Sequence, residues 1–522
     1  GDVVAELRRR KGRDEKPFAL MVRDLDAAKR IAHVSDAEAE LLQSSRRPIV
    51  LLLRRKAASG IAGEVAPGNP NLGVMLPYTP LHHLLMREFD APLVLSSGNP
   101  SDEPIAFADA DARSRLTGIA DAFLTHDRPI HLRCDDSVTR VVAGEESPIR
   151  RSRGYAPQPV TLPVECEQPT LALGGQLKST FAIGRGRHAI LSHHLGDLDH
   201  YEAYRAYTEA VRHYERLFGV RPAVIAHDLH PDYASTRYAL ERAREDDSVR
   251  LVGVQHHHAH LASCLADHGL AGPAIGVIFD GTGFGTDGTV WGGEFLFGDC
   301  RGFRRAAHLR PVAMPGGEVA IREPWRMALA YLLDAREDAA WLTGRLDSPT
   351  VRAAECQVAK RLNAPLTSGA GRLFDAVASL AGVRDRVGYE GQAAIELEGL
   401  ATGVSPDGAY PFEVEGGQVD TRPLIAAVAA DARRGTSKHR IARRFHSTLV
   451  EIVVSVCRSI RSETACDAVA LSGGVFLNAV LSEEASARLA AEGFRVYRQR
   501  QVPPNDGGLC LGQLAVAAAS GG

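Results

Sequence analysis

The sequence predicts an α+β domain followed by a larger α/β region made of two similar lobes. Over the first part of the chain, short apolar runs such as 49–53 and 92–95 alternate with amphipathic helical stretches, as in an α+β domain. Further on, a strand, a glycine turn, more strands and then helices follow from Leu171, and the same order starts again from Ile275. Two such units about a hundred residues apart indicate a duplicated lobe.

Glycines follow the expected strands at three places in the second region. Glycine lets backbone N–H groups approach phosphate oxygens without a Cβ in the way, although a glycine at a strand end is most often only a turn. We therefore expect a nucleotide between the halves, with Asp280, Asp375 and Asn478 available for ribose or base contacts. The glycine turns are Gly174-Gly175, Gly281-Thr282-Gly283 and Gly473-Gly474, the last leading into a helix from about residue 475.

A proline-rich segment separates the two regions. Residues 158–169 hold Pro159, Pro163 and Pro169 with little periodicity, which predicts an extended linker. The expected domains are therefore 1–157 and 170–522, and the second divides into a first lobe at about 170–272 and a second lobe at about 273–522.

Composition limits the class of protein. The 522 residues are 45% hydrophobic and 24% charged, with a net charge of −3, so no basic field favours a nucleic acid. No apolar run approaches the length of a membrane span, and we expect no membrane partner. The eight cysteines include no CxxC pair, which favours reduced thiols in the cytoplasm. Because the chain lacks an initiator Met, we expect it to be a fragment or a processed chain.

His256 and His260 form an HxxxH pair in the segment 254–260. On a helix ending near Gly269, both would project from one polar side with Ser263 and Asp267, while His258 turns toward a core. Such a pair can bind one metal ion, but it is also compatible with a solvated helix start whose histidines do nothing.

Asp506 lies in the turn 502–508, before the final helical stretch. Alone it is most simply an N-cap. With the two histidines it would complete a two-histidine, one-carboxylate set for Fe(II) or zinc, with open positions for a substrate oxygen.

The basic segment 2–16 and the turn 96–101 are candidate sites in the first region. Lys11, Arg13 and Lys16 would form a phosphate cradle, or else one face of a solvated helix. The hydroxyls and amide of the turn, including Ser97 and Asn99, would bind a small polar substrate.

Together these segments resemble known families. The first region is similar to the YrdC-like domain of carbamoyl and threonylcarbamoyl adenylate synthases, on residues 11–17, 76–82, 96–104 and 151–157. The second resembles the Kae1/TsaD-like branch of the actin, Hsp70 and sugar kinase fold, on residues 174–180, 227–233, 255–260, 279–288, 323–327, 371–377 and 389–392. This order on one chain resembles the HypF-type hydrogenase maturation carbamoyltransferases, without their N-terminal acylphosphatase and zinc-finger regions.

The resemblance implies roles for individual residues. It implies that His256, His260 and Asp506 bind a divalent metal, Fe or Zn. It also implies that ATP with Mg²⁺, or carbamoyl adenylate, binds to the residues named next. In the first region it implies that the nucleotide and substrate pocket contains Lys11, Arg13, Lys16, Ser97 and Asn99. In the second it implies nucleotide contacts at Gly174, Gly175, Lys178, Asp280, Gly281, Thr282, Gly283, Asp375, Gly391 and Asn478.

The implied reaction has two stages. Carbamoyl phosphate and ATP give carbamoyl adenylate, and the carbamoyl group then passes to the C-terminal cysteine of a partner, HypE, for cyanide ligand synthesis. The missing upstream regions leave hydrolysis of carbamoyl phosphate in doubt, and the first part of the YrdC-like domain is also expected to be cut off. The alternatives are a small-molecule O-carbamoyltransferase, threonylcarbamoylation of tRNA, and a non-catalytic nucleotide-dependent scaffold; the weakly acidic net charge argues against the tRNA.

Overall fold

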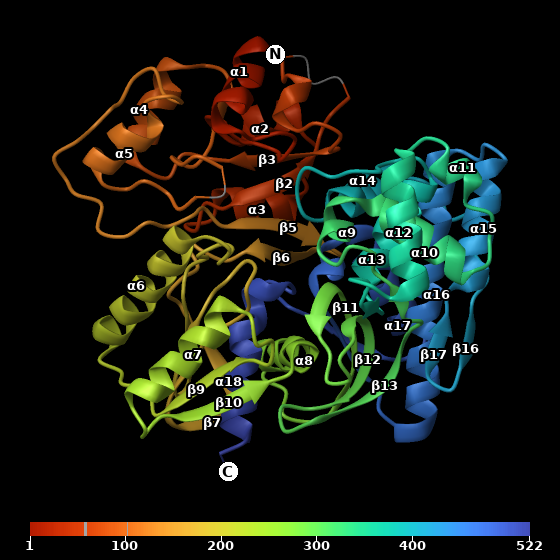
Figure 1. Cartoon of the computed structure of the whole chain (residues 1–522). Helices are drawn as coiled ribbons and strands as arrows, with labels where there is room; N and C mark the ends of the chain where they lie inside the picture. The colour runs from red at the N-terminus through yellow and green to blue at the C-terminus, as the bar shows by residue number, and fades with distance from the viewer. Residues whose placement is uncertain (57–59, 102, 522) are drawn as a thin grey trace. The chain divides into compact units, whose positions relative to one another are not determined.

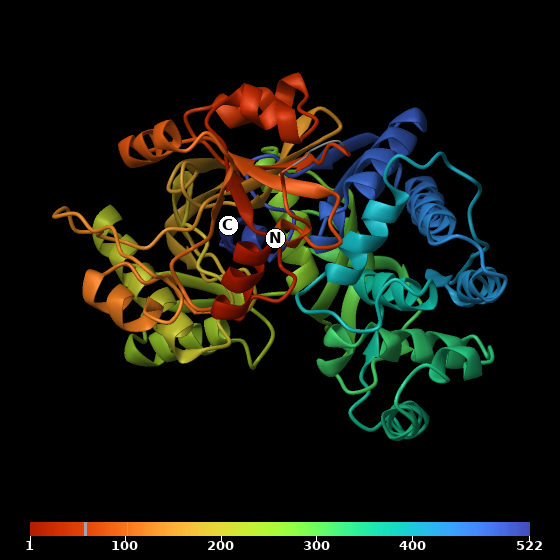
Figure 2. The ribbon, with the colours of Figure 1, turned by 90° about the horizontal axis from the view of Figure 1, so that it is seen from above.

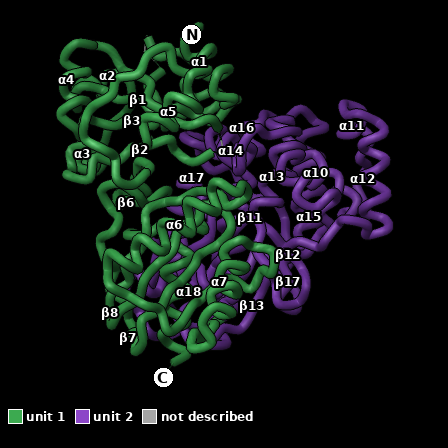
Figure 3. Tube along the Cα trace, turned by 60° about the vertical axis from the view of Figure 1, so that its left-hand side comes forward, with its two compact units in different colours: residues 1–252, 500–521 green, residues 253–499, 522 purple. Residues whose placement is uncertain are grey.

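The computed structural model describes residues 1–56, 60–101 and 103–521. Asp102, in the 96–104 stretch, and Gly522, in the expected second lobe, lie outside them. Over the described residues the chain divides into two compact units (Figure 3). Unit 1 comprises Gly1–Val252 and Arg500–Gly521, and unit 2 begins at Gly253 and continues to Gln499. The residues from 500 onward, which we expected in the second lobe, therefore group with the first.

The N-terminal part of unit 1 is one mixed sheet with helices, drawn red to orange (Figures 1 and 2). The sheet has the order β4-β1-β3-β2-β5-β6. Its strands are β1 (Ala19–Met21), β2 (Ile49–Leu53), β3 (Asn71–Met75), β4 (Leu93–Leu95), β5 (Val138–Val142) and β6 (Glu145–Arg150). The helices are α1 (Asp2–Lys11), α2 (Leu25–Ile31), α3 (Asp36–Gln43), η1 (Gly63–Val65), α4 (Pro80–Glu88) and α5 (Asp109–Leu116).

Local sequence signals explain several of these boundaries. Ser35 and Glu38 form a capping box at the start of α3, and Thr79 caps α4 just before Pro80. Helix α1 ends at Gly12, whose φ of 61° is left-handed, so the expected helical segment 2–16 stops after Lys11. The chain then turns back toward β1, and this turn carries Arg13 and Lys16.

The second part of unit 1 is a sheet with the order β10-β9-β7-β8. Its core joins residues of α6 and α7 to residues of the sheet, and α18 contacts β7, β8 and β9. The elements are β7 (Pro159–Ala172), β8 (Ala182–Leu191), α6 (Tyr201–Phe218), β9 (Val224–Asp228), α7 (Ala234–Glu245), β10 (Arg250–Val254), η3 (Asp506–Gly508) and α18 (Leu509–Ala519).

The segment 158–169, expected as a linker, is largely strand. Strand β7 begins at Pro159 and pairs antiparallel with β8. Its register shifts twice, between Thr161 and Cys166 and again between Cys166 and Thr170. Proline is tolerated at the first residue of a strand and at irregularities, so the prolines that suggested a linker lie where this strand can accept them.

Unit 2 is built on a sheet with the order β16-β17-β13-β12-β11-β18-β19, with β15 pairing β12 and β14 pairing β15. The strands are β11 (Ala274–Phe284), β12 (Val290–Gly298), β13 (Phe303–Leu309), β14 (Val312–Ala313), β15 (Leu366–Thr367), β16 (Glu413–Glu415), β17 (Gln418–Asp420), β18 (Ala468–Ser472) and β19 (Arg495–Arg498). The helices are α8 (His256–Asp267), α9 (Val319–Arg322), α10 (Pro324–Asp334), α11 (Ala340–Thr343), α12 (Ser348–Lys360), α13 (Ala370–Leu380), α14 (Gln392–Ala401), α15 (Arg422–Arg433), α16 (Lys438–Thr464), η2 (Gly474–Leu477) and α17 (Ala479–Ala491).

The two lobes repeat one strand pattern, as the sequence predicts. In unit 1, β7 pairs antiparallel with β8 and parallel with β9. In unit 2, β11 pairs antiparallel with β12 and parallel with β18. The largest apolar core of unit 2 lies between this sheet and helices such as α10, α13 and α16.

Candidate functional site

Helix α8, which carries the HxxxH pair, is buried along its whole length. Its N-cap Gln255 accepts a hydrogen bond from the His258 backbone N–H at 2.9 Å. His256 and His260 are both fully buried, and so is His258 apart from 5% of its surface. The alternative of a solvated helix start is therefore wrong: the side that carries His256 and His260 is buried like the core side, and the helix packs against β11, β12 and β18.

The two histidines meet Asp280 of β11. His260 Nε2 lies 2.9 Å and His256 Nε2 3.7 Å from Asp280 Oδ2. Burial alone would raise the pKa of Asp280, but hydrogen bonds and charge from the two imidazoles hold it well below the usual range. One ligand atom from each of the three residues lies within 4.8 Å of the others. Two imidazoles and a carboxylate at this spacing are a donor set that suits Fe(II) or zinc.

Asp280 is the donor that the sequence pattern did not assign to the metal. It lies within β11, at the point where the pairing of β11 with β12 is interrupted between Phe279 and Gly283. Bulges of this kind re-aim side chains and are common beside active sites. An aspartate directly before the glycines was the available signal, but the sequence pattern offered it for ribose or base contacts.

Gly283 is required by the close approach of α8. A Cβ at this position would lie 2.5 Å from His257 Cε1 and 2.8 Å from His256 Cδ2. Such distances are far inside van der Waals contact. The third residue of the segment Gly281-Thr282-Gly283 thus lies directly against the candidate metal ligand His256.

Asp506 belongs to unit 1, where it starts η3. Its Oδ2 lies 3.4 Å from the position that a Cβ on Gly175 would take. Gly174 has a left-handed φ of 70°, and its N–H donates to Gln513 Oε1 of α18 at 2.8 Å. The structure therefore brings the first glycine turn and Asp506 together within unit 1.

Lys178 follows this turn. It has a φ of 48°, and its backbone N–H donates to Asp197 Oδ1 at 2.7 Å. Thr180 Oγ1 then donates to the Gly507 carbonyl at 3.0 Å, which ties the same loop to η3.

The segment Gly281-Thr282-Gly283, expected as a turn, lies within the irregular part of β11 and packs against the start of α13. A Cβ on Gly371 would lie 2.9 Å from Gly281 Cα, so glycine permits this contact. One turn further along α13, Asp375 Oδ2 pairs with Arg372 Nη2 at 2.8 Å. Burial raises the pKa of Asp375 to about 6 against the opposing charge of Arg372. The expected ribose contact is thus a buried carboxyl in the middle of α13, paired with Arg372, whose Nη2 lies 3.6 Å from the position that a Cβ on Gly281 would take.

Gly391 and Asn478 are both N-caps. Gly391 precedes α14 with a φ of 74°, and Asn478 Oδ1 accepts the Leu481 N–H at 3.0 Å in α17. Asn478 Nδ2 lies 2.9 Å from His446 Nε2. A neighbouring residue that the sequence did not suggest is Glu398 of α14, whose Oε1 accepts the Ala479 N–H at 3.0 Å.

In the N-terminal part, the structure brings Lys11, Ser97 and Asn99 together. Lys11 Nζ donates to the Ser97 and Asn99 carbonyls at 2.7 and 2.8 Å. Ser97 Oγ donates to Asn99 Oδ1 at 2.6 Å. Burial, followed by the charge of Arg13, lowers the pKa of Lys11 to about 8.

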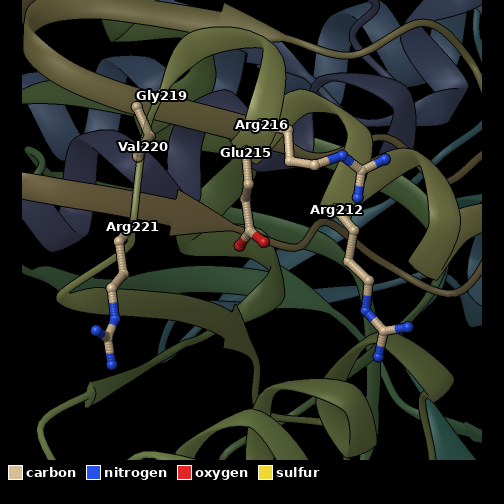
Figure 4. A pocket seen from close by; sticks show the side chains of 6 residues that line it. All are labelled: Arg212, Glu215, Arg216, Gly219, Val220 and Arg221. Carbon is tan, nitrogen blue, oxygen red and sulfur yellow. The ribbon is translucent and has the colours of Figure 1, made fainter.

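Arg13 and Lys16 occupy the turn after α1. The Arg13 guanidinium donates to the Lys16 and Pro17 carbonyls at 3.0 and 2.6 Å. Sequence reasoning missed Arg8, a buried side chain that also contacts this turn. The surface pocket in Figure 4 lies elsewhere, at the end of α6, and contains none of the expected site residues.

That pocket holds paired charges. Glu215 pairs with Arg242 at 3.0 Å and Arg221 with Asp246 at 2.6 Å. Arginines at a helix C-terminus complement its partial negative charge, which gives the cluster a structural explanation.

Relatives over nearly the whole chain decide the family. The carbamoyltransferase HypF2 of Cupriavidus necator is 44% identical over 99% of this chain and 69% of that protein. The chain belongs to the HypF carbamoyltransferase family. HypF from Synechocystis is 41% identical over 98% of this chain and 68% of its own length. The predicted class of enzyme, a carbamoyltransferase, is confirmed.

Family models agree with the order of the HypF regions. A model described as "Telomere recombination", which covers the Sua5, YciO and YrdC proteins, matches residues 1–152. The "HypF Kae1-like domain" matches 165–267, and "Carbamoyltransferase, Kae1-like Domain, second subdomain" matches 276–513. The predicted fold class, a YrdC-like α+β domain before a duplicated-lobe Kae1-like domain, is confirmed.

Solved HypF structures have the same fold. A full-length HypF in the phosphate- and nucleotide-bound form superposes with a TM-score of 0.95 at 43% identity, over 99% of this chain and 68% of that one. HypF of T. kodakarensis gives a TM-score of 0.93 at 34% identity, over 99% and 69%. Among the described residues, we find no helix with the length and apolar character of a membrane span.

Proposed function

We propose that this chain forms carbamoyl adenylate and transfers its carbamoyl group to the C-terminal cysteine of a HypE partner, for cyanide ligand synthesis in [NiFe] hydrogenase maturation. The observation that carries the proposal is the buried His256, His260 and Asp280 cluster, on the same chain as the contacts among Lys11, Ser97 and Asn99. A non-catalytic scaffold would have no use for such a cluster. The scattered cysteines favour the cytoplasm as the place of the reaction.

The first step is adenylation in the YrdC-like region, proposed as residues 1–157. A carbamate oxygen, derived from carbamoyl phosphate, attacks the α-phosphorus of ATP held with Mg²⁺. One O–P bond forms, the bond to the leaving oxygen breaks, and pyrophosphate departs. Lys11, Arg13 and Lys16 stabilise charge on the phosphates, which is the main requirement of this reaction. Ser97 and Asn99 orient the carbamate through a hydroxyl and an amide.

The second step is transfer in the Kae1-like region, proposed as 170–522. A thiolate of the acceptor attacks the carbamoyl carbon; an S–C bond forms, the C–O bond to the phosphate breaks, and AMP leaves. His256, His260 and Asp506 would bind a metal, Fe or Zn, and Asp280 adds a further carboxylate beside the histidines. When bound, such a metal supplies a Lewis acid for the carbamoyl oxygen.

The nucleotide contacts follow from the glycine turns and their neighbours. Gly174, Gly175 and Lys178 are proposed for one set of backbone contacts to phosphate, and Gly281, Thr282 and Gly283 for another. Asp375 and Gly391 are proposed for the ribose. Asn478 is proposed for the adenine side, supported by its position at the N-terminus of α17.

The two steps can be measured separately. Carbamoyl-phosphate-dependent exchange of labelled pyrophosphate into ATP reports adenylation, and mass spectrometry of HypE reports a carbamoyl adduct on its C-terminal cysteine. HypE with that cysteine changed to serine is the matched control. Exchange without any adduct would contradict the HypE assignment and favour a small-molecule acceptor, whereas loss of both would contradict adenylate chemistry.

A further inference from the structure

Arg8 of α1 is a buried arginine whose hydrogen bonds converge on the proposed phosphate cradle. Arg8 is only 9% exposed. Nη1 donates to the carbonyls of Arg13, Asp14 and Lys16 at 3.2, 2.7 and 3.1 Å. Three carbonyls of one short turn therefore face a single nitrogen.

The other two nitrogens of Arg8 fix the turn to a second segment. Nε donates to the Glu64 carbonyl at 2.6 Å and Nη2 to the Val65 carbonyl at 3.2 Å, both in η1. The Arg8 backbone also takes part, because its carbonyl accepts the Arg13 N–H at 2.9 Å. One residue thus contacts the turn 12–17 from the helix side and joins it to η1.

Phe18 links Arg8 to Arg13. The guanidinium carbon of Arg8 lies 4.6 Å from the centre of the Phe18 ring, and that of Arg13 lies 4.9 Å from it. Phe18 is only 2% exposed, so the ring is a fixed surface for both cations. The orientation of the Arg13 side chain therefore depends on the same buried cluster.

The chemistry of the turn explains why a cation is needed there. Converging carbonyl oxygens create a region of negative potential, which would oppose a bound triphosphate beside it. A guanidinium neutralises this potential and offers five N–H donors in a rigid fork, as many as the carbonyls it contacts. A lysine has three donors on a flexible stem and cannot reproduce the arrangement.

We infer that Arg8 is a positioning residue for ATP binding in the YrdC-like region, acting through the turn that carries Arg13 and Lys16. This inference rests on the proposed adenylation. Arg8 fixes the backbone between Gly12 and Pro17 and cancels its carbonyl dipoles, so that the Arg13 and Lys16 cations are held ready for the phosphates before ATP arrives.

The test compares Arg8→Met and Arg8→Lys with Arg9→Met. Arg9 is the next residue on the same helix, its side chain is 73% exposed, and it pairs with Glu6, which makes it a matched control. In pyrophosphate exchange we expect the KM for ATP to rise about tenfold in Arg8→Met with a smaller change in kcat, an intermediate rise in Arg8→Lys, and none in Arg9→Met.

Hydrogen exchange locates the effect on the chain. Without nucleotide, amides of residues 13–16 should exchange about tenfold faster in Arg8→Met, and ATP should protect them less, while peptides of unit 2 keep their exchange rates. If Arg8→Met does not fold, the same measurements are made on Arg8→Lys. An unchanged KM for ATP with unchanged protection of residues 13–16 overturns the inference.

The two proposals fail differently. If the unmodified chain shows neither exchange activity nor ATP protection at residues 13–16, adenylation in this region is wrong. The exchange rates of the nucleotide-free variants still decide whether Arg8 orders the turn.

Discussion

His260 Nε2 of α8 lies 2.9 Å from Asp280 Oδ2 of β11, with both residues buried in unit 2. If these atoms share a metal ion, Asp280→Asn should weaken binding by roughly 10- to 100-fold, because the amide supplies no negative charge. Metal content by mass spectrometry and competition with a chelator measure this. Asp467→Asn, which removes only a partly exposed partner of Arg495, is the control. Equal metal retention in both variants would exclude Asp280 as a ligand or close partner.

Gly283→Ala should disturb the same site without removing any donor atom. The new methyl group would collide with the His257 and His256 rings, so we expect weaker metal binding and a loss of about 1–3 kcal/mol in unfolding free energy. Gly302→Ala, where a Cβ meets nothing within 4 Å, should change neither. The tryptophans 291, 325 and 341 all lie in unit 2, so their fluorescence reports its unfolding. Normal metal content in Gly283→Ala would show that the histidines can move.

Asp375 should make the stability of unit 2 depend on pH. Because burial raises its pKa to about 6, the folded state favours the protonated carboxyl, and its contribution to stability is lost as the pH rises through that value. Relative to Asp375→Asn, the unmodified chain should lose about 1 kcal/mol of unfolding free energy between about pH 5 and about pH 7. Urea titrations followed by tryptophan fluorescence measure the difference. Parallel curves for the two proteins would place the Asp375 pKa outside this window.

Lys11 should make adenylation sensitive to alkaline pH. Its pKa of about 8 means that the ammonium loses its proton as the pH rises through that value, and with it the charge that faces the phosphates. We expect kcat/KM for ATP in pyrophosphate exchange to fall above about pH 8 and to stay flat in Lys11→Arg, since arginine remains charged. Lys29→Arg, an exposed change in the same domain, should keep the native profile. If kcat/KM for ATP falls in the same way in Lys11→Arg, the titrating group is not Lys11.

The sequence predicted the order of the domains and the repeated lobe because these depend on local signals. A strand rich in apolar residues followed by glycines recurs at Gly174 and at Gly281, although Gly281 proves to lie within β11 and not in a turn after it. The sequence predicted helix α8 but not its complete burial, because the side with His256, His260, Ser263 and Asp267 consists of polar residues that are usually exposed. The helix is buried because it packs against β11, which follows it closely in the sequence, and against β18, which lies about 200 residues further on. The contact with β18 could not be seen in the local sequence.

Contacts between residues that are far apart in the chain could not be predicted from a single sequence. Asp280 lies beside His260 at the irregularity in β11, and Arg8 contacts the Glu64 carbonyl across 56 residues of sequence. The prolines of 158–169 indicated a linker because proline usually opposes strands. Their positions at the start and irregularities of β7 are visible only when the partner strand is known.

The pairing of Gly174 with Gln513 spans 339 residues of sequence. During synthesis, the sheet of β7, β8 and β9 leaves the ribosome long before α18, the helix that contacts all three strands, has been translated. The apolar surface beneath α18 stays exposed while unit 2 is being made. A chain truncated within unit 2 therefore lacks α18 and has an incomplete first lobe.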